Sequence, residues 1–110
     1  MKNDIPESPY YAAIFTSLRT EIDEGYEQMA QRMLELATTM EGFLHADSVR
    51  QDGLGITVSY WRDQVAIQQW KQQAEHLEAQ RLGREKWYAS YRLCICKVER
   101  EYGFEALVAQ

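Results

Sequence analysis

Cysteine, proline and histidine are scarce in this chain, which has two of each among its 110 residues. The cysteines, Cys94 and Cys96, are separated by one residue on a predicted strand, so their side chains share one face. Their Cα atoms would lie about 6–7 Å apart along the strand, which suits a mutual disulfide poorly. We therefore expect two reduced thiols, and we find no further ligands around them at the spacing of a zinc site.

Long apolar runs and an excess of positive charge are also absent. No stretch approaches the roughly 20 apolar residues of a membrane-spanning helix, and residues 1–9 lack the apolar middle of a signal peptide. The net charge of -5, from 12 basic and 17 acidic residues, argues against nucleic acid or an anionic membrane as the partner. We expect a cytoplasmic protein with a single domain over residues 1–110, a core at about 10–100 and a C-terminal tail at 101–110.

The hydrophobic pattern switches between a period of two and a period of about 3.6, which is typical of alternating strands and helices. It predicts strands at about 10–18, 43–50, 55–61 and 89–99, and helices at about 23–40 and 63–80. Asp52 and Gly53 favour a hairpin, Asp63 can cap the second helix, and that helix is expected to break near Gly83. The βαββαβ order predicts an α+β, ferredoxin-like sandwich with both helices on one face of an antiparallel sheet.

The predicted strands are apolar on both faces, although the helices of such a sandwich cover only one. One set consists of Tyr11, Phe15, Val58, Tyr60, Leu93 and Ile95, and the opposite set of Tyr10, Ile14, Trp61, Cys94 and Val98. An exposed apolar patch larger than a few hundred Å2 usually marks an interface. A second copy of the same sheet, related by a two-fold axis, is the simplest cover, so we expect a homodimer.

All three tryptophans bracket one predicted strand-helix unit at residues 56–87. Trp61, Trp70 and Trp87 can either wall a flat pocket or anchor a core. His76 is the candidate acid or base, because the pKa of histidine lies near neutrality. On one continuous helix His76 lies about 120° from Trp70, at the edge of the apolar stripe, so a surface or packing role is the alternative.

Arg92 follows a bulky apolar residue and precedes another on the last predicted strand. An unpaired arginine would be costly to bury there, so Arg92 meets a carboxylate, faces an anion-binding pocket or stays solvated. Glu75, Glu78 and Glu85 are typical of a solvated helix face, on which Arg81 can pair with Glu85. The chain has no Gly-rich phosphate loop and no Ser-His-Asp order.

A strand ending in YWRD, the helical segment AIQQW and the later segments EHLEA and GREKWY resemble the antibiotic biosynthesis monooxygenase (ABM) superfamily. The resemblance covers residues 10–104, and it implies ferredoxin-like protomers that associate into a dimeric α+β barrel. The superfamily contains cofactor-free quinone-forming oxygenases and haem-degrading enzymes.

The polar residues of both chemistries match this chain only in part. The haem-degrading branch would place its iron-ligating histidine at Gln80, and an asparagine near Thr16 or Ser17. The cofactor-free members rely on asparagine, tryptophan and arginine, whereas the only asparagine here is Asn3.

These residues and the resemblance together favour a cofactor-independent monooxygenase that acts on a flat aromatic or polyketide-like molecule. The expected binding residues, from a cavity between helices and sheet and from the last strand, are Tyr11, Trp61, Trp70, His76, Trp87 and Arg92. Deprotonation by His76 would give a carbanion that reacts with oxygen without flavin or metal. The alternatives are a dimer that binds a small ligand without turnover, and a haem-binding member in which His76 ligates the iron.

Overall fold

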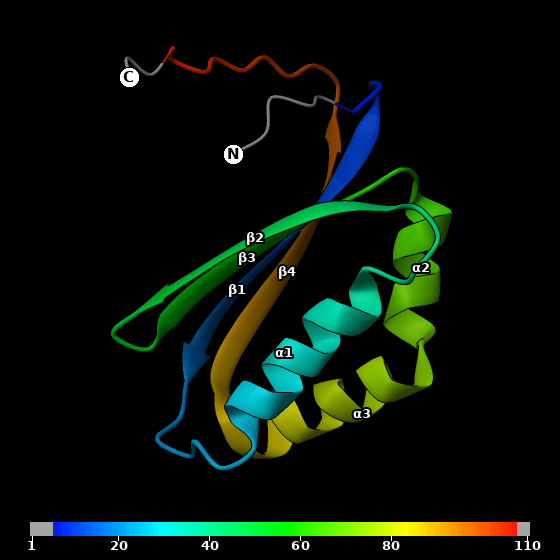
Figure 1. Cartoon of the computed structure of the whole chain (residues 1–110). Helices are drawn as coiled ribbons and strands as arrows, with labels where there is room; N and C mark the ends of the chain where they lie inside the picture. The colour runs from blue at the N-terminus through cyan, green and yellow to red at the C-terminus, as the bar shows by residue number, and fades with distance from the viewer. Residues whose placement is uncertain (1–5, 108–110) are drawn as a thin grey trace.

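The computed structural model describes residues 6–107, so residues 1–5, and residues 108–110 of the predicted tail, lie outside the described part (Figure 1). The elements are β1 (Tyr10–Arg19), α1 (Tyr26–Ala37), β2 (Phe43–Gln51), β3 (Leu54–Trp61), α2 (Gln64–Gln72), α3 (Ala74–Leu82), the π-helical turn η1 (Gly83–Trp87) and β4 (Tyr88–Val98). The predicted strands and the first predicted helix are confirmed to within a few residues at each end.

The strands form one antiparallel sheet in the order β2-β3-β1-β4, and α1, α2 and α3 lie on the same face of it (Figure 1). This arrangement confirms the α+β, ferredoxin-like sandwich. β1 is a central strand, which agrees with its two apolar faces, whereas β2 and β4 are edge strands. Within residues 6–107, no helix combines the length and the apolar character needed to cross a membrane.

The second predicted helix is interrupted at Gln73, a break that was not expected, and so forms two helices, α2 and α3. Gln73 has an extended backbone with ψ 133°, and its side-chain oxygen accepts the backbone N–H of His76 at 3.0 Å. This side-chain cap starts a new helix and competes with continuation of α2. The α-helix does end beside Gly83, as expected: α3 stops at Leu82, and Gly83, with ordinary helical torsions, opens the π-helical turn η1. The cap at Asp63 is confirmed, because its Oδ1 accepts the Ala66 N–H at 2.8 Å.

The register of β1 decides which side chains face the helices. Tyr11 lies opposite Trp61 on β3 and opposite Lys97 on β4, and directly opposed residues share a face. Because Trp61 packs against α2, this row faces the helices. Val58 and Tyr60 therefore point to the outer face, and grouping them with Tyr11 was wrong. The hydrophobic alternation of a single strand does not reveal its register against its neighbours.

The core centres on Trp61, whose side chain is 0% exposed. The buried cluster comprises Ala13, Ala37, Trp61 and Ala66, with Met40, Phe43, Ile67 and Trp70 packed against it. Phe43 meets Trp61 edge to face at 5.2 Å, and the indole N–H donates to Ser59 Oγ at 2.9 Å. Three alanines thus let α1 and α2 approach the sheet closely around one large ring.

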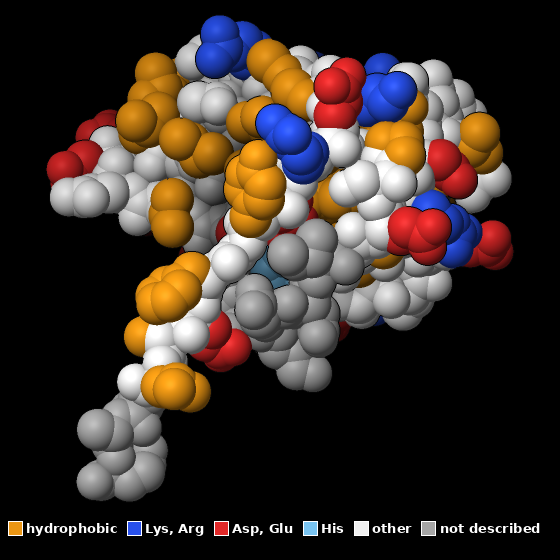
Figure 2. All heavy atoms as spheres, turned by 90° about the horizontal axis from the view of Figure 1, so that it is seen from above, with side chains coloured by type: hydrophobic (Ala, Val, Ile, Leu, Met, Phe, Trp, Pro, Cys, Tyr) orange, Lys and Arg blue, Asp and Glu red, His pale blue; other side chains and the backbone are white. Residues whose placement is uncertain are grey.

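The outer face of the sheet and the C-terminal segment expose apolar side chains. On the outer face these include Leu18, Val49, Leu54 and Ile56. Beyond β4 the chain runs as an extended segment that projects from the body and carries hydrophobic side chains along its length (Figure 2). Tyr102 and Phe104 on this segment are both exposed.

We predict that Trp61→Ala lowers the free energy of unfolding by about 3–5 kcal/mol, because the substitution empties the centre of the core. Urea denaturation followed by circular dichroism measures the change. Tyr102→Ala is the matched control, because it removes an exposed ring and should stay within about 0.5 kcal/mol of the wild type. Equal losses in the two variants would contradict the central place of Trp61.

Candidate functional site

Three rings from β3, α2 and α3 form a continuous stack. The Trp61 and Trp70 rings lie 6.0 Å apart at an interplanar angle of 28°, and the Trp70 and His76 rings lie 4.1 Å apart at 15°. The break at Gln73 makes this stack possible, because it turns α3 back toward the end of α2. The structure therefore brings together three of the residues proposed from the sequence.

The hydrogen bonds of His76 define its tautomer. Its Nδ1 lies 2.8 Å from the backbone carbonyl oxygen of Trp70, and a carbonyl can only accept, so Nδ1 carries the proton. In the neutral ring the lone pair then belongs to Nε2, and within residues 6–107 no hydrogen bond occupies that atom. The Gln80 amide nitrogen approaches Nδ1 to 3.4 Å, but it donates to the Lys71 carbonyl at 3.0 Å.

Burial sets the protonation state of His76. Desolvation disfavours the imidazolium and lowers the pKa of His76 below the ordinary value of 6.5, while the hydrogen bond to the Trp70 carbonyl opposes this shift. A neutral imidazole at physiological pH with a free Nε2 lone pair can accept a proton. In this neutral state the imidazole of His76 is able to act as a general base.

Tyr11 lies beside the stack, on an open side of the sandwich. It is half-buried and opposes Trp61 directly across the β1–β3 pair. Next to β1, the helix-facing side of β4 remains accessible: Tyr91, Leu93 and Ile95 are 42%, 48% and 43% exposed. The helices therefore do not seal the sheet along β4, and an apolar strip beside Tyr11 is available to a ligand.

Trp87 lies at the opposite end of the helix layer from the stack. Its backbone oxygen accepts the Thr20 N–H at 2.8 Å, and its indole N–H donates to the Glu24 carbonyl at 3.0 Å. The distance along β1 from Tyr11 to Arg19 is about 26 Å for eight residues of strand. Trp87 instead packs edge-on to Tyr26 at 5.7 Å, in a second aromatic cluster.

Arg92 lies on the outer face of the sheet. It opposes Thr16 on β1, and Thr16 lies an odd number of residues from Tyr11, so the two side chains point to opposite faces of the sheet. The Arg92 side chain is therefore exposed on the side away from the helices. Within one protomer, the structure therefore brings neither Arg92 nor Trp87 to the ring stack. The register of β4 against β1, which the sequence does not give, turns Arg92 away from the stack, whereas the length of β1 separates Trp87 from it.

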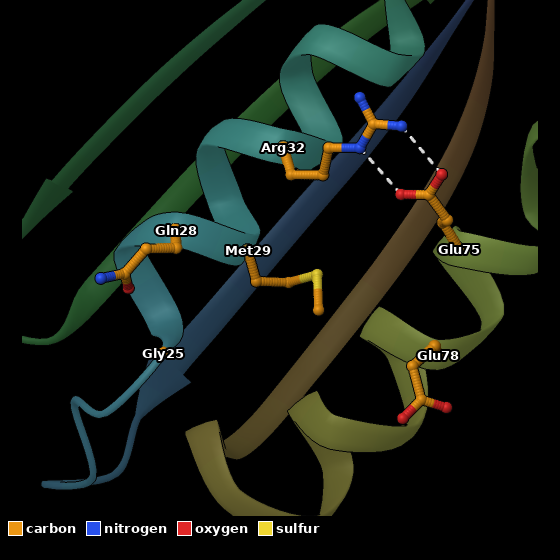
Figure 3. A pocket seen from close by; sticks show the side chains of 6 residues that line it. All are labelled: Gly25, Gln28, Met29, Arg32, Glu75 and Glu78. Carbon is orange, nitrogen blue, oxygen red and sulfur yellow. Dashed lines mark hydrogen bonds and ion pairs between the residues drawn. The ribbon is translucent and has the colours of Figure 1, made fainter.

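A shallow hollow of about 270 Å³ lies between α1 and α3 (Figure 3). Its lining residues are Gly25, Gln28, Met29, Arg32, Glu75 and Glu78. Arg32 donates through two nitrogens to the two oxygens of Glu75, both at 2.8 Å, and this pairing lowers the pKa of Glu75. The pair ties the first turn of α3, which carries His76, to α1. Glu75 lies on a solvated face, as the sequence predicts. Its pairing with Arg32 could not be predicted from local spacing, because the two residues lie 43 positions apart.

Comparisons with known proteins agree with these observations. The model of the antibiotic biosynthesis monooxygenase family matches residues 9–82. The protein YqjZ of Bacillus subtilis strain 168, itself uncharacterised, is 48% identical over 101 residues, which cover 91% of this chain and 89% of YqjZ.

Two solved structures share the fold at low sequence identity. PA3566 from Pseudomonas aeruginosa is 19% identical and superimposes with a TM-score of 0.69, covering 86% of this chain and 96% of that one. SnoaB from Streptomyces nogalater, a cofactor-independent oxygenase, is 12% identical with a TM-score of 0.73, covering 86% and 97%. At these identities the likeness shows the fold alone.

The lowered pKa of His76 predicts a pH-dependent stability. The unfolded chain binds a proton at this ring more tightly than the folded one, so the free energy of unfolding should fall as the pH drops from 6.5 through the folded pKa. Urea denaturation between about pH 7.5 and about pH 5 measures this slope. In His76→Gln the slope should flatten, whereas His45→Gln, on the outer face of β2, should retain it. An unchanged slope in His76→Gln would contradict the burial of this ring.

Proposed function

Because the chain belongs to the antibiotic biosynthesis monooxygenase family, we propose that it is a cofactor-independent monooxygenase acting on a flat aromatic or polyketide-like molecule. The observation that carries this proposal is the His76 ring, half-buried, with Nδ1–H held by the Trp70 carbonyl and the Nε2 lone pair unengaged within the described residues. The fold shared with SnoaB, a cofactor-independent oxygenase, agrees with the proposal.

The apolar strip of β4 offers a place for the flat part of the substrate. Leu93 and Ile95 expose almost half of their surface beside the helix layer, and they lie opposite Phe15 and Ala13 on β1. Tyr11 is diagonal to Ile95 at one end of this strip. Trp70 already packs against both Trp61 and His76, so its main contribution is to hold the imidazole in place. The substrate would rest on the strip with its acidic group directed toward Nε2 of His76.

The proposed reaction begins when Nε2 of His76 takes a proton from an activated C–H or O–H group. The resulting electron-rich anion reduces molecular oxygen, and one oxygen atom enters the substrate while the other leaves as water. An activated methylene group thus loses both of its hydrogen atoms and becomes a carbonyl group, and each molecule of oxygen consumed releases one molecule of water. The substrate itself supplies the electrons, so a reaction of this kind consumes neither flavin nor metal.

Two observations favour a second candidate, a dimer that binds a small apolar ligand without turnover. The space under α2 is filled by Trp61, Met40 and Phe43 rather than lined by converging polar groups. Asparagine is also missing from the described strands.

A haem-binding role for His76 has weaker support. Gln80 takes the position of the iron-ligating histidine of the haem-degrading branch, and its amide donates to the Lys71 carbonyl.

We also propose that two copies associate through the outer faces of their sheets. Leu18, Leu54 and Ile56 are exposed there, and a stable association needs an interface of more than about 1,000 Å2. Sedimentation equilibrium at micromolar concentration should give twice the protomer mass of 12.9 kDa. Ile56→Asp should shift the protein toward the monomer, whereas Val65→Asp, on the exposed side of α2, should not. A monomer at every concentration tested would overturn this proposal.

Oxygen consumption tests the proposed activity directly. We predict that the purified protein consumes oxygen with an anthrone or a dihydroxynaphthalene in the absence of flavin and metal. His76→Gln should lower the turnover rate by about 10²–10⁴-fold, the usual contribution of a general base. His45→Gln is the matched control and should keep the wild-type rate, since its ring lies on the outer face of the sheet.

Two outcomes would redirect the proposal. Equal rates in His76→Gln and the wild type would remove the catalytic role of His76 and favour the binding protein. A haemin titration followed at the Soret band covers the haem alternative: one-to-one binding that His76→Gln abolishes would make this histidine the iron ligand.

A further inference from the structure

Lys97 lies on the helix-facing side of β4, in the row of side chains that includes the candidate site. Tyr11 opposes Lys97 on one side and Trp61 on the other, so the three side chains cross three strands in one line. Directly opposed residues have Cβ atoms about 4.5–5.5 Å apart, which places Lys97 within about 10 Å of Trp61. The long side chain of Lys97 can therefore place its ammonium group beside Tyr11, at the Trp61 end of the stack.

The surroundings of Lys97 leave its charge available. Within residues 6–107, no carboxylate lies within ion-pairing distance of its ammonium group, whereas Arg19, Arg32, Arg62 and Arg81 all have acidic partners. Lys97 is exposed, and its neighbour on the same face of β4 is Ile95, followed by Leu93. The helix-facing side of β4 thus presents an apolar strip that ends at Lys97, a cation without an ion-pair partner among residues 6–107.

We propose that Lys97 binds the oxyanion of the substrate and thereby selects molecules with an ionisable phenol or enol at one end. The inference rests on the substrate class given under the proposed function. The apolar rings would lie on Leu93 and Ile95, and the oxygen would meet the ammonium group of Lys97. A nearby positive charge favours the ionised form of a hydroxyl group and lowers its pKa by about 1–3 units.

This role complements that of His76. The proton of the substrate passes to Nε2 of His76, and the negative charge that remains on the substrate oxygen is held by Lys97. The two residues come from different elements, His76 from α3 and Lys97 from β4. Analogues whose hydroxyl group is methylated would leave the cation without a partner and should bind more weakly.

Binding of 4-nitrophenol tests the proposal without requiring turnover, because the phenolate absorbs at a longer wavelength than the phenol. Spectrophotometric pH titration in the presence of excess wild-type protein should show an acid dissociation constant of the bound phenol raised by at least about tenfold. Lys97→Met should abolish the shift, and Lys97→Arg should restore most of it. Lys71→Met, which removes an exposed lysine from α2, is the matched control and should behave as the wild type.

The possible results separate this inference from the proposed activity. A shift that survives in Lys97→Met, that disappears equally in Lys71→Met, or that is absent in the wild type overturns the role of Lys97. Circular dichroism of the Lys97 variants confirms that the fold is retained. A Lys97-dependent shift in a protein that consumes no oxygen supports oxyanion binding and assigns the failure to the catalytic proposal alone.

Discussion

The candidate site depends on one hydrogen bond, from the backbone N–H of His76 to the side-chain oxygen of Gln73 at 3.0 Å. On a continuous helix, His76 would lie about 120° around the axis from Trp70. The extended backbone of Gln73 ends α2, and its side chain caps α3, so the chain turns back on itself. The Trp70 carbonyl then accepts both the Gln73 N–H at 3.2 Å and the His76 Nδ1–H at 2.8 Å, which uses both of its lone pairs.

Because its partner is a backbone carbonyl, His76 is less readily protonated than a histidine oriented by a carboxylate. A carboxylate partner would stabilise the imidazolium, whereas a carbonyl fixes the tautomer without a compensating negative charge. Burial against Trp70 then lowers the pKa of His76, and the neutral ring predominates. The Arg32–Glu75 pair holds the first turn of α3 against α1, so the position of the base depends on two helices and not on α3 alone.

The sandwich itself could be predicted because periodicity records burial element by element. The two apolar faces of β1, the helical period of α1 and the cap at Asp63 all follow from local rules, and the structure bears them out. The break at Gln73 could not be predicted in this way. The apolar positions on either side of residue 73 keep the helical period whether this glutamine lies in mid-helix or caps a new helix.

Which residues belong to the candidate site depends on strand register and strand length, and no local sequence pattern contains the register. The register of β1 against β3 and β4 decides that Trp61 and Lys97 share a face with Tyr11, and that Arg92 does not. The length of β1 separates Trp87 from the stack although all three tryptophans are close in sequence. A one-residue change of register would exchange the two faces, so a site that combines several strands has to be read from the structure.

The tautomer and charge of His76 are the central claim, and nitrogen NMR measures both. In protein labelled with ¹⁵N-histidine, long-range ¹H–¹⁵N correlation at neutral pH distinguishes the two neutral tautomers and the imidazolium, and His45→Gln assigns the remaining ring. The structure predicts a neutral His76 with the proton on Nδ1 and an unprotonated Nε2. A proton on Nε2 alone, or an imidazolium at pH 7, would contradict the role of this ring as a base.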